Sequence, residues 1–433
     1  MVLAARRNDE YDAVIVGGGI GGVAAARRLL EAGKRVCLLE AQDRWGGRTK
    51  LARSSAVPGV TVDVGGQWVG PTHTRLLELL RTLGLPLVRQ YGRGADLLDD
   101  GQQIRKSLNL GTNIPRVSML ALLEVQFIIV GKLERLARRM PASDVLLRDG
   151  SGAAARRLAA LDATSCEAWL RERCWTRDAV RLGALTVEML LGVEPAQLSL
   201  LSLLQYIRAN GSLSFLVEVE NAAQQWWVGG GGMGRVAPLL VEALRREHGS
   251  RLDARLGSPV RRVEKLDGGR LGVCLGSGEA LVAAHVLLAL PPTACLERIE
   301  LRPAPGPEWQ RCAARAFMGC YTKCVVLYDA PFWRERGLSG TCMRLAWDAE
   351  HPVQSIYMTT RKGLGLTLTL TLTLTLTRTR TLALALTRCR TSTTTPRARP
   401  TRSLPPRGSA RRPSPPPPRA STGTGRPRRW CAS

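Results

Sequence analysis

The sequence predicts an α/β protein of two domains, in which a Rossmann-like sheet domain is interrupted by a mainly helical block with some sheet. Three observations predict this organisation. Residues 11–49 follow the order strand, glycine-rich turn, helix and strand. Strand patterning then returns at residues 251–290, after a helical block. Finally, the composition changes abruptly after residue 360, which indicates a disordered C-terminal tail.

The first predicted strand leads directly into three spaced glycines. Residues 13–16 are apolar and rich in β-branched side chains, which is typical of a buried parallel strand. Gly17, Gly19 and Gly22 follow with the G-x-G-x-x-G spacing. The first glycine allows a tight turn, the second lets backbone N–H groups approach a pyrophosphate, and the third lets a helix lie close to the strand. The pattern therefore predicts a dinucleotide site.

A helix, a second strand and an acidic residue complete this unit. We expect a helix over Ala24–Ala32, closed by Gly33 as a C-cap, with its N-terminus directed at the phosphates. A second strand over residues 36–39 ends at Glu40, whose carboxylate can bind the ribose hydroxyls. Its charge disfavours a 2′-phosphorylated ribose. These features leave both FAD and NAD open as the dinucleotide.

Two segments after Glu40 resemble the flavin-containing amine oxidase family, which includes the monoamine and polyamine oxidases. They are Arg44-Trp45-Gly46-Gly47-Arg48 and Asp63-Val64-Gly65-Gly66-Gln67-Trp68-Val69-Gly70. The resemblance implies FAD as the cofactor, with Arg48 forking to the pyrophosphate and the second segment running beside the flavin ring. It implies FAD contacts from Gly17, Gly19, Ile20, Gly22, Glu40, Ala41, Gly47, Arg48, Gly65, Gly66, Gln67, Trp68 and Val260.

The resemblance also implies an FAD-binding oxidoreductase fold with a discontinuous cofactor domain. That domain comprises residues 9–75 and 225–295, and the substrate domain comprises residues 76–224 and 296–360. Residues 361–433 form the tail.

Helical patterns fill the middle of the predicted substrate domain. They cover Pro71–Leu83, Val117–Arg139, Arg177–Leu191 and Ser199–Ala209, and Ser165 can N-cap a further helix.

Two residues in the later part of the chain match catalytic positions of the family. The segment Asn221-Ala222-Ala223-Gln224 resembles the one that brings a glutamine to the substrate cavity, so Gln224 is a candidate. Lys323 falls on the lysine that holds a water against flavin N5. Val260 matches a valine whose backbone pairs with the adenine. The glycine run at residues 229–232 is not followed by Gly-Lys-Ser/Thr, so we reject a phosphate loop there.

The basic character of the chain is concentrated in its tail. The formal net charge is +26, with 62 basic and 36 acidic residues. Residues 361–433 hold 16 of the basic residues and none of the acidic ones, which leaves a net charge of +10 in the first 360. This tail contains a Thr-Leu dipeptide repeat and then Pro, Arg, Ser and Thr, a low-complexity composition that predicts disorder and weak, salt-sensitive polyanion binding.

Cysteine usage and hydropathy indicate the compartment. The eleven cysteines are scattered, odd in number and without a C-x-x-C pair, and no signal peptide precedes Tyr11, so we expect an intracellular, cytoplasmic protein. No group of cysteines and histidines has zinc spacing, so we expect no metal. No apolar run reaches the roughly 18 residues of a transmembrane helix, so we expect no integral membrane segment.

The resemblance implies FAD-dependent oxidation of a primary or secondary amine to an imine and an aldehyde, with O₂ reduced to H₂O₂. It ends near residue 360, which indicates that the family's C-terminal part is missing or replaced by a gene-model or frameshift product. We therefore expect impaired activity. Three alternatives remain: a catalytically defective flavoprotein fragment, an Arg-rich-tailed binder of nucleic acid, and another FAD enzyme of the same fold, of the carotenoid desaturase or protoporphyrinogen oxidase type.

Overall fold

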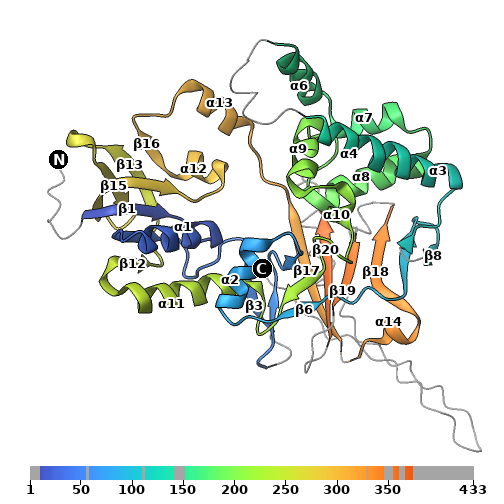
Figure 1. Ribbon diagram of the computed structural model, residues 1–433, viewed down its shortest axis with the longest axis horizontal. Helices are drawn as coiled ribbons and strands as arrows, with labels where there is room; N and C mark the ends of the chain where they lie inside the picture. Colours follow the sequence, from blue (N-terminus) through green and yellow to red (C-terminus); the bar gives the residue numbers. More distant parts are fainter. Residues whose placement is uncertain are drawn as a thin grey trace, which may run out of the picture.

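The structure is a computed structural model that describes residues 10–54, 58–109, 113–140, 152–328, 330–345, 355–359 and 366–373. One mixed sheet with its covering helices forms one end of the molecule, and a helical block above a second large sheet forms the other (Figure 1). This arrangement confirms the predicted mixed α/β fold class.

The first sheet has seven strands in the order β12-β2-β1-β15-β14-β13-β16. The strands β12, β2, β1 and β15 run parallel to one another, and β14 runs antiparallel to both β15 and β13. Their bounds are β1 Glu10–Val16, β2 Val36–Leu39, β12 Leu252–Arg255, β13 Val260–Lys265, β14 Leu271–Leu275, β15 Ala280–Leu288 and β16 Glu300–Arg302. Because β16 pairs with β13, the sheet extends beyond residue 295, where we expected the cofactor half to end.

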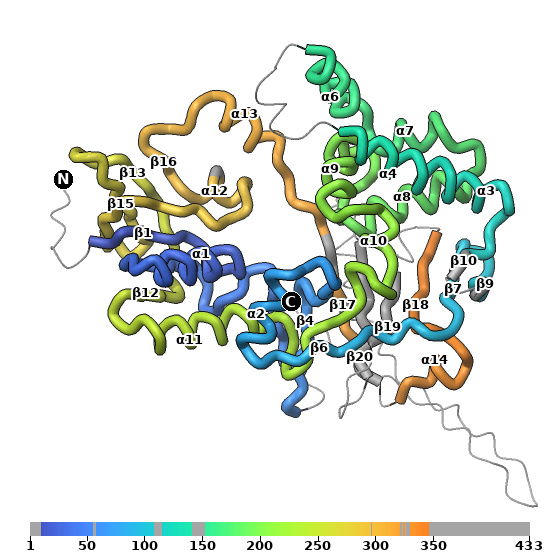
Figure 2. The backbone as a smooth tube through the Cα atoms, in the orientation of Figure 1, coloured from blue at the N-terminus to red at the C-terminus, as the bar shows by residue number. Residues whose placement is uncertain are grey.

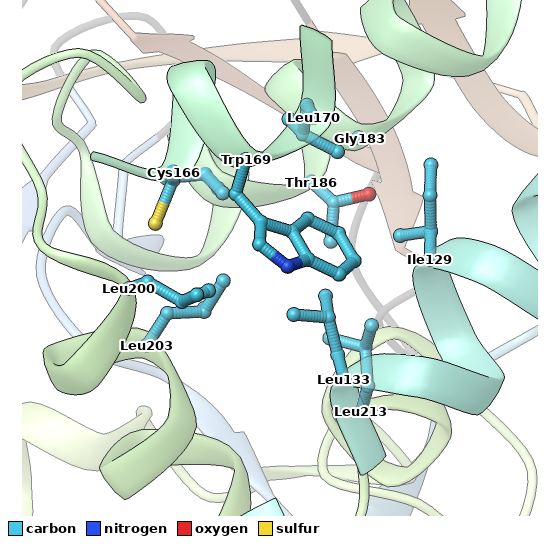
Figure 3. Close-up of a pocket in the computed structure, with 11 residues that line it drawn as sticks. Ile129, Leu133, Cys166, Trp169, Leu170, Gly183, Thr186, Leu200, Leu203 and Leu213 are labelled. Atoms are coloured by element: carbon cyan, nitrogen blue, oxygen red, sulfur yellow. The ribbon is translucent and has the colours of Figure 1, made fainter. Parts of the chain in front are cut away.

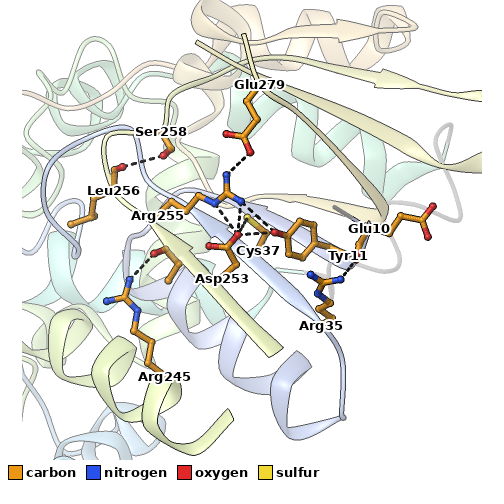
Figure 4. Close-up of polar contacts among 11 residues, drawn as sticks. Glu10, Tyr11, Arg35, Cys37, Arg245, Asp253, Arg255, Leu256, Ser258 and Glu279 are labelled. Atoms are coloured by element: carbon orange, nitrogen blue, oxygen red, sulfur yellow. Dashed lines mark hydrogen bonds and ion pairs between the residues drawn. The ribbon is translucent and has the colours of Figure 1, made fainter. Parts of the chain in front are cut away.

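A polar network joins strands of this sheet that are distant in sequence (Figure 4). The Tyr11 hydroxyl donates to Asp253 Oδ2 at 2.6 Å, across 242 residues of sequence. Arg255 donates to the same carboxylate at 2.6 and 2.8 Å and to Glu279 at 2.7 Å. The network links β12 to β1 across the intervening strand β2, although a long helical insertion separates β1 and β12 along the chain.

Two helices, α1 Ile20–Glu31 and α11 Val236–His248, lie side by side against this sheet (Figures 1 and 2). The structure corrects the predicted start of α1, which begins at Ile20 and not at Ala24. Glycine is tolerated in this first turn because the first four N–H groups of a helix have no intrahelical partner. Gly22 is required by packing, since a Cβ there would lie 1.9 Å from the Gly17 carbonyl oxygen.

A smaller three-stranded sheet, in the order β5-β11-β6, follows the first lobe. The strands β5 Trp68–Val69 and β6 Leu87–Arg89 both pair with β11 Trp226–Val228. Further short elements are β3 Leu51–Arg53, β4 Thr61–Asp63, α2 Thr74–Thr82 and the 3₁₀ turn η3 Met233–Arg235. Two more 3₁₀ turns belong to the seven-stranded sheet: η4 Gly249–Arg251 precedes β12, and η5 Asp267–Gly269 connects β13 to β14.

The helical block contains the helices α3 Met119–Leu123, η2 Glu124–Val130, α4 Gly131–Arg138, α6 Ala153–Ala163, α7 Cys166–Arg173, α8 Arg177–Leu191, α9 Leu200–Asn210 and α10 Leu213–Val217. Ser165 caps α7, as predicted, by accepting a hydrogen bond from the Ala168 N–H. The helix predicted over 117–139 is three consecutive segments, of which the middle one, η2, is a π-helix. A buried apolar core of leucines and Trp169 holds the block together.

The second large sheet has the order β17-β20-β19-β18-β7-β8. Its strands are β7 Ala95–Asp99, β8 Ile104–Lys106, β17 Tyr321–Tyr328, β18 Leu338–Arg344, β19 Ser355–Thr359 and β20 Leu366–Thr373. The remaining elements are β9 Leu108–Asn109, β10 Asn113–Ile114, α12 Pro292–Arg298, α13 Pro307–Arg315 and α14 Phe332–Glu335.

The strand β20 corrects one prediction. Disorder was expected throughout residues 361–433, but residues 366–373 of the Thr-Leu repeat pair with both β17 and β19. An alternating sequence of β-branched and apolar residues has the two-residue period of a strand, and β17 offers it an open edge. The remainder of the predicted tail lies outside the described residues.

None of the described helices combines the length and apolar character needed to cross a membrane. Among the described residues there is also no group of three or more His, Cys, Asp or Glu side chains that could hold a metal ion.

Candidate functional site

The acidic residue at the end of β2 is tied to the glycine turn at the end of β1. Glu40 is 9% exposed, and its Oε2 accepts a hydrogen bond from the Gly18 N–H at 2.7 Å. Its Oε1 accepts from the Gln42 N–H at 2.9 Å. A carboxylate has about four lone-pair positions, so acceptor capacity remains for a ligand hydroxyl. Gly19 stands at the N-cap of α1, where free N–H groups favour an anion.

The two segments that carry the family resemblance lie against this turn. The Gly46 N–H donates to the Gly18 carbonyl at 2.8 Å, and Gly19 forms a bridge with Gly46. Gly66 donates to the Arg48 carbonyl at 3.1 Å, and a Cβ on Gly65 would lie 2.1 Å from that carbonyl oxygen. Only glycine at position 65 permits this approach. The Arg48 side chain itself is exposed.

The start of β13 lies near the acid end of β2. The Ser258 N–H donates to the Glu40 carbonyl at 2.8 Å, and Gly257 donates to the Gln42 carbonyl at 2.8 Å. Val260 follows two residues later as the first residue of β13 and is 6% exposed. Ala41, between these two contacts, is exposed. Val260 and Glu40 are therefore brought to the same region, although the valine's contact with an adenine stays a prediction.

Lys323 connects the second large sheet to the Gly65-Gly66-Gln67 stretch. It lies on β17, and its Nζ donates to the Gly65 carbonyl at 3.1 Å and to Gln67 Oε1. The two ends of the first contact are 258 residues apart in sequence. Burial lowers the pKa of Lys323 to about 8, and the nearby Asp63 carboxylate opposes this shift. The side chain is thus held in an environment where it releases its proton near pH 8, well below the usual range for lysine.

Gln224 lies on a different element from Lys323. It precedes β11, which pairs with β5 so that Trp227 faces Trp68 and Trp226 faces Val69. Gln224 Oε1 is buried and has no hydrogen-bond partner among the described residues. No hydrogen bond joins Gln224 to Lys323 within the described part of the chain. A buried acceptor without a partner is costly, so a ligand donor or water is expected there.

The sequence predictions missed two residues that shape this region. Asp63 accepts hydrogen bonds from the N–H groups of Met233 at 2.9 Å and Gly234 at 3.0 Å, and so joins β4 to the turn before α11. Trp45 covers Gly18, since a Cβ on that glycine would lie 2.4 Å from the indole ring. For Asp63, the sequence did offer a signal, because this residue lies directly before the Val-Gly-Gly-Gln stretch.

An apolar pocket in the helical block is a separate feature (Figure 3). Its lining is apolar apart from Thr186, whose hydroxyl donates to the Leu182 carbonyl at 2.8 Å. None of the predicted site residues lines it. The pocket is therefore a gap in the packing of the helical core and not part of the candidate site.

The lowered pKa of Lys323 predicts a pH-dependent stability. The folded chain releases this proton near pH 8, whereas an unfolded lysine retains it to about pH 10.4, so the unfolded state binds more protons between these values. The free energy of unfolding of the wild type should therefore rise with pH relative to Lys323→Met, by at most about 1.4 kcal/mol per pH unit. Below pH 8 the difference should be constant. Urea unfolding of both proteins from pH 7 to pH 10 measures it, and a pH-independent difference would contradict the assignment.

Comparison with known proteins agrees with this geometry. The family described as flavin containing amine oxidoreductase matches residues 20–380. AofH of Mycobacterium tuberculosis, named as a flavin-containing monoamine oxidase, is 33% identical over 77% of this chain and 68% of its own length. Flavin-containing amine oxidase A of Canis lupus familiaris is 30% identical over 79% of this chain and 61% of its own length.

Two solved structures show the same architecture. Putrescine oxidase bound to putrescine superimposes with a TM-score of 0.72 and 28% identity, covering 84% of this chain and 75% of that chain. Cyclohexylamine oxidase from Brevibacterium oxydans has a TM-score of 0.71 and 28% identity, covering 83% of this chain and 74% of that chain.

Proposed function

Because the chain belongs to the flavin-containing amine oxidoreductase family, we propose that it binds FAD and oxidises a primary or secondary amine, with O₂ as the electron acceptor. The observation that carries this proposal is the position of Lys323. It is partly buried, its pKa is lowered to about 8, and it donates to Gly65 and Gln67, which belong to the Gly-Gly-Gln-Trp stretch. A polarised, buried amine fixed at this stretch is suited to holding a water or proton beside a redox cofactor.

The residues present fit an FAD molecule at several points. Gly19 leaves open space beside the N-terminus of α1, where a Cβ would meet no protein atom within 4 Å. Glu40 is buried at the end of β2 and can accept from the ribose hydroxyls. Gly47 and the exposed Arg48 lie at the same turn, so Arg48 can reach a pyrophosphate. Ile20 begins α1 beside Gly19.

The chemistry that FAD supplies when bound is two-electron oxidation: an amine, O₂ and water give an aldehyde, ammonia or a smaller amine, and H₂O₂, by way of an imine. The chain's own residues bind and orient the cofactor and the substrate, and they hold protons and water near the reacting atoms. Lys323 keeps its Nζ at the Gly65 carbonyl and can hold a water at that point. Gln224 offers its buried Oε1 to a substrate N–H. Trp68, opposite Trp227 in the three-stranded sheet, supplies aromatic surface nearby.

The names of the relatives favour amines over the other substrates considered. The relatives described above are named as amine, putrescine or cyclohexylamine oxidases, and none of those names mentions a carotenoid or a protoporphyrinogen. A nucleic-acid function rests only on the basic tail, which lies almost wholly outside the described residues. An intracellular location likewise stays a prediction that rests on the cysteine pattern.

We further propose that turnover is lower than in the longer relatives. Residues 366–377 are a Thr-Leu repeat, and the strand β20 within it is the neighbour of β17, which carries Lys323. In the family that the sequence resembles, the C-terminal part supplies aromatic residues that flank the substrate amine. A repeat without aromatic residues cannot supply them, and a misplacement of the amine by about 1 Å can cost roughly 100-fold in rate.

Cofactor analysis and an oxidase assay together test the proposal. The purified full chain should release FAD, identified by chromatography against FAD and FMN standards. It should produce H₂O₂ when putrescine, cyclohexylamine or benzylamine is added, at a rate below that of a chimera carrying a relative's C-terminal segment after Thr360. Release of FMN, or H₂O₂ production that does not depend on an amine, would overturn the proposal. Equal rates for the two proteins would contradict the impaired turnover alone.

A further inference from the structure

Four buried polar atoms without a hydrogen-bond partner lie in two neighbouring segments of the three-stranded sheet. They are Gln90 Oε1, Gln224 Oε1, Gln225 Oε1 and Trp227 Nε1, and none has a partner among the described residues. As whole residues, Gln90 and Gln225 are only 6% and 8% exposed. Protein interiors leave few such groups unpaired, so this concentration indicates a place that receives a polar ligand. Gln224 belongs to the site described above, whereas the other three residues have no role in it.

The strand pairing places these three side chains on one face of the sheet. The Gln90 N–H donates to the Gln225 carbonyl at 2.8 Å, which extends the pairing of β6 with β11 by one residue. Because alternate residues of a strand share a face, Gln90, Gln225 and Trp227 lie on the same side. Trp68 of β5 is paired with Trp227 and shares this side. We call these four residues the polar face, which combines two indole rings with two carboxamides.

The polar face is directed away from the core of the first lobe. Val69 and Val228 lie on the opposite face of the same sheet and are buried in that hydrophobic core. The chain leaves β6 toward β7 of the second large sheet (Figures 1 and 2). Tyr91, the residue after Gln90, lies 3.9 Å below the guanidinium of Arg334, which belongs to α14 of the second lobe. The polar face is therefore located between the two lobes.

Two connections along the chain join the polar face to the candidate site. Trp68 directly follows Gln67, which accepts a hydrogen bond from the Lys323 Nζ. Gln225 directly follows Gln224, the residue proposed to accept from the substrate amine. A substrate whose amine is bound at Gln224 can therefore extend its far end over the polar face.

The hydrogen-bonding groups of the polar face suit a neutral hydroxyl. Each carboxamide oxygen accepts, whereas the Trp227 Nε1 can only donate. A hydroxyl satisfies both kinds of group, because its O–H donates while its oxygen accepts. An ammonium has donors only, and burying its charge without a carboxylate partner is costly. The positive charge of Arg334 beside Tyr91 further disfavours an ammonium in this region.

We propose that the polar face binds a hydroxyl group at the far end of the amine substrate, so that the chain selects amino alcohols over alkylamines and diamines. This inference rests on the proposed amine oxidation and names the substrate class for it. The hydroxyl donates to the Oε1 of Gln90 or Gln225 and accepts from the Trp227 N–H. A site built to hydrogen-bond a hydroxyl rejects the analogue that lacks one, because the buried groups of the site then stay unpaired.

Matched substrates and a pair of glutamine variants test this selectivity. The kcat/KM of each linear amino alcohol from 3-amino-1-propanol to 6-amino-1-hexanol is divided by that of the alkylamine of equal chain length. In the full wild-type chain at least one of these ratios should reach about tenfold. Gln90→Leu with Gln225→Leu should reduce that ratio to about one. The control, Gln102→Leu with Gln103→Leu, makes the same change at two exposed glutamines between β7 and β8 and should keep the wild-type ratio.

Two single variants and a stability measurement separate hydrogen bonding from packing. Trp227→Phe removes the N–H but keeps an aromatic ring, so the ratio should fall by about threefold or more. Gln225→Glu adds a carboxylate and should shift the preference toward the diamine of the same chain length. In urea unfolding, the double leucine variant should be at least as stable as the wild type, because it removes buried acceptors that have no partner among the described residues. A marked loss of stability would instead assign the two glutamines to the fold and overturn the proposal.

The outcomes distinguish this proposal from the amine oxidase function on which it rests. If the wild type oxidises amines with and without a hydroxyl equally well, or if the double leucine variant keeps the wild-type ratio, the polar face does not bind the hydroxyl although amine oxidation stands. If no amine is oxidised, the amine oxidase function itself fails, and isothermal titration tests the polar face. The wild type should then bind the amino alcohol about tenfold more tightly than the alkylamine, and the double leucine variant should not. Equal affinities in the wild type would overturn the proposal.

Discussion

Replacing Gly19 with valine is expected to weaken flavin binding by at least about 100-fold, because the side chain would occupy the space that the pyrophosphate needs. The folded protein itself has room for this change. Gly19 has φ −69° and ψ 170°, which valine adopts readily, and a Cβ there meets no protein atom within 4 Å. The expected result is therefore a folded protein without flavin. The measurement is the visible flavin absorbance per mole of purified protein.

Gly306→Val is the matched control for this substitution. Gly306 also stands at the N-cap of a helix, α13, with φ −57° and ψ 157°, and a Cβ there likewise meets no protein atom within 4 Å. It lies outside the glycine turn, so its flavin content should equal that of the wild type. If Gly19→Val retains its flavin, the dinucleotide site does not lie at the N-terminus of α1.

Lys323→Met is expected to lower amine-dependent H₂O₂ production by about 100-fold or more while leaving flavin content nearly unchanged. Methionine has a similar length but cannot donate to the Gly65 carbonyl and Gln67 or hold a water there. Stopped-flow absorbance separates the amine-dependent reduction of the flavin from its reoxidation by O₂. The substitution should affect at least one of these rates and not the affinity for FAD.

The control for Lys323→Met is the same change on another strand. Lys265 is exposed at the end of β13, so Lys265→Met removes a positive charge without disturbing the site. Activity equal to the wild type is expected for this protein. A fully active Lys323→Met variant would refute the catalytic role of the lysine. If the variant loses flavin and activity to the same extent, the lysine serves to hold the flavin and not to catalyse the reaction.

Individual strands and helices could be predicted from the sequence because apolar periodicity and helix capping depend on only a few neighbouring residues. The strand before Gly17, the strand that ends at Glu40 and the helix over Arg177–Leu191 are all present, since apolar periodicity and capping are local signals. The predicted start of α1 at Ala24 is too late, because the helix already contains Gly21 and Gly22 in its first turn. Gly22 packs against the Gly17 carbonyl just after β1, a contact that the local pattern of the helix does not report.

The long-range parts could not be predicted from local patterns. The π-helical segment around Glu124 is stabilised by hydrogen bonds to Trp175 and Thr176, 51 and 52 residues later, and no signal near Glu124 indicates them. The strand β20 depends on an open edge of β17 and not only on its own repeat.

Part of the candidate site depended on the family resemblance. Lys323 and Gly65 were both candidates, but only the structure shows that they are hydrogen-bonded across the two large lobes. Asp63 was missed because its role, accepting from Met233 and Gly234, depends on a turn that is 170 residues away.

The most direct test of the central claim is anaerobic mixing of the FAD-loaded protein with an amine. An amine oxidase site predicts that the visible absorbance of the oxidised flavin bleaches with putrescine, cyclohexylamine or benzylamine, and that admitted O₂ restores it with one H₂O₂ released per flavin reoxidised. Flavin that stays oxidised with every amine but is bleached by a protoporphyrinogen or a carotene precursor would contradict the account.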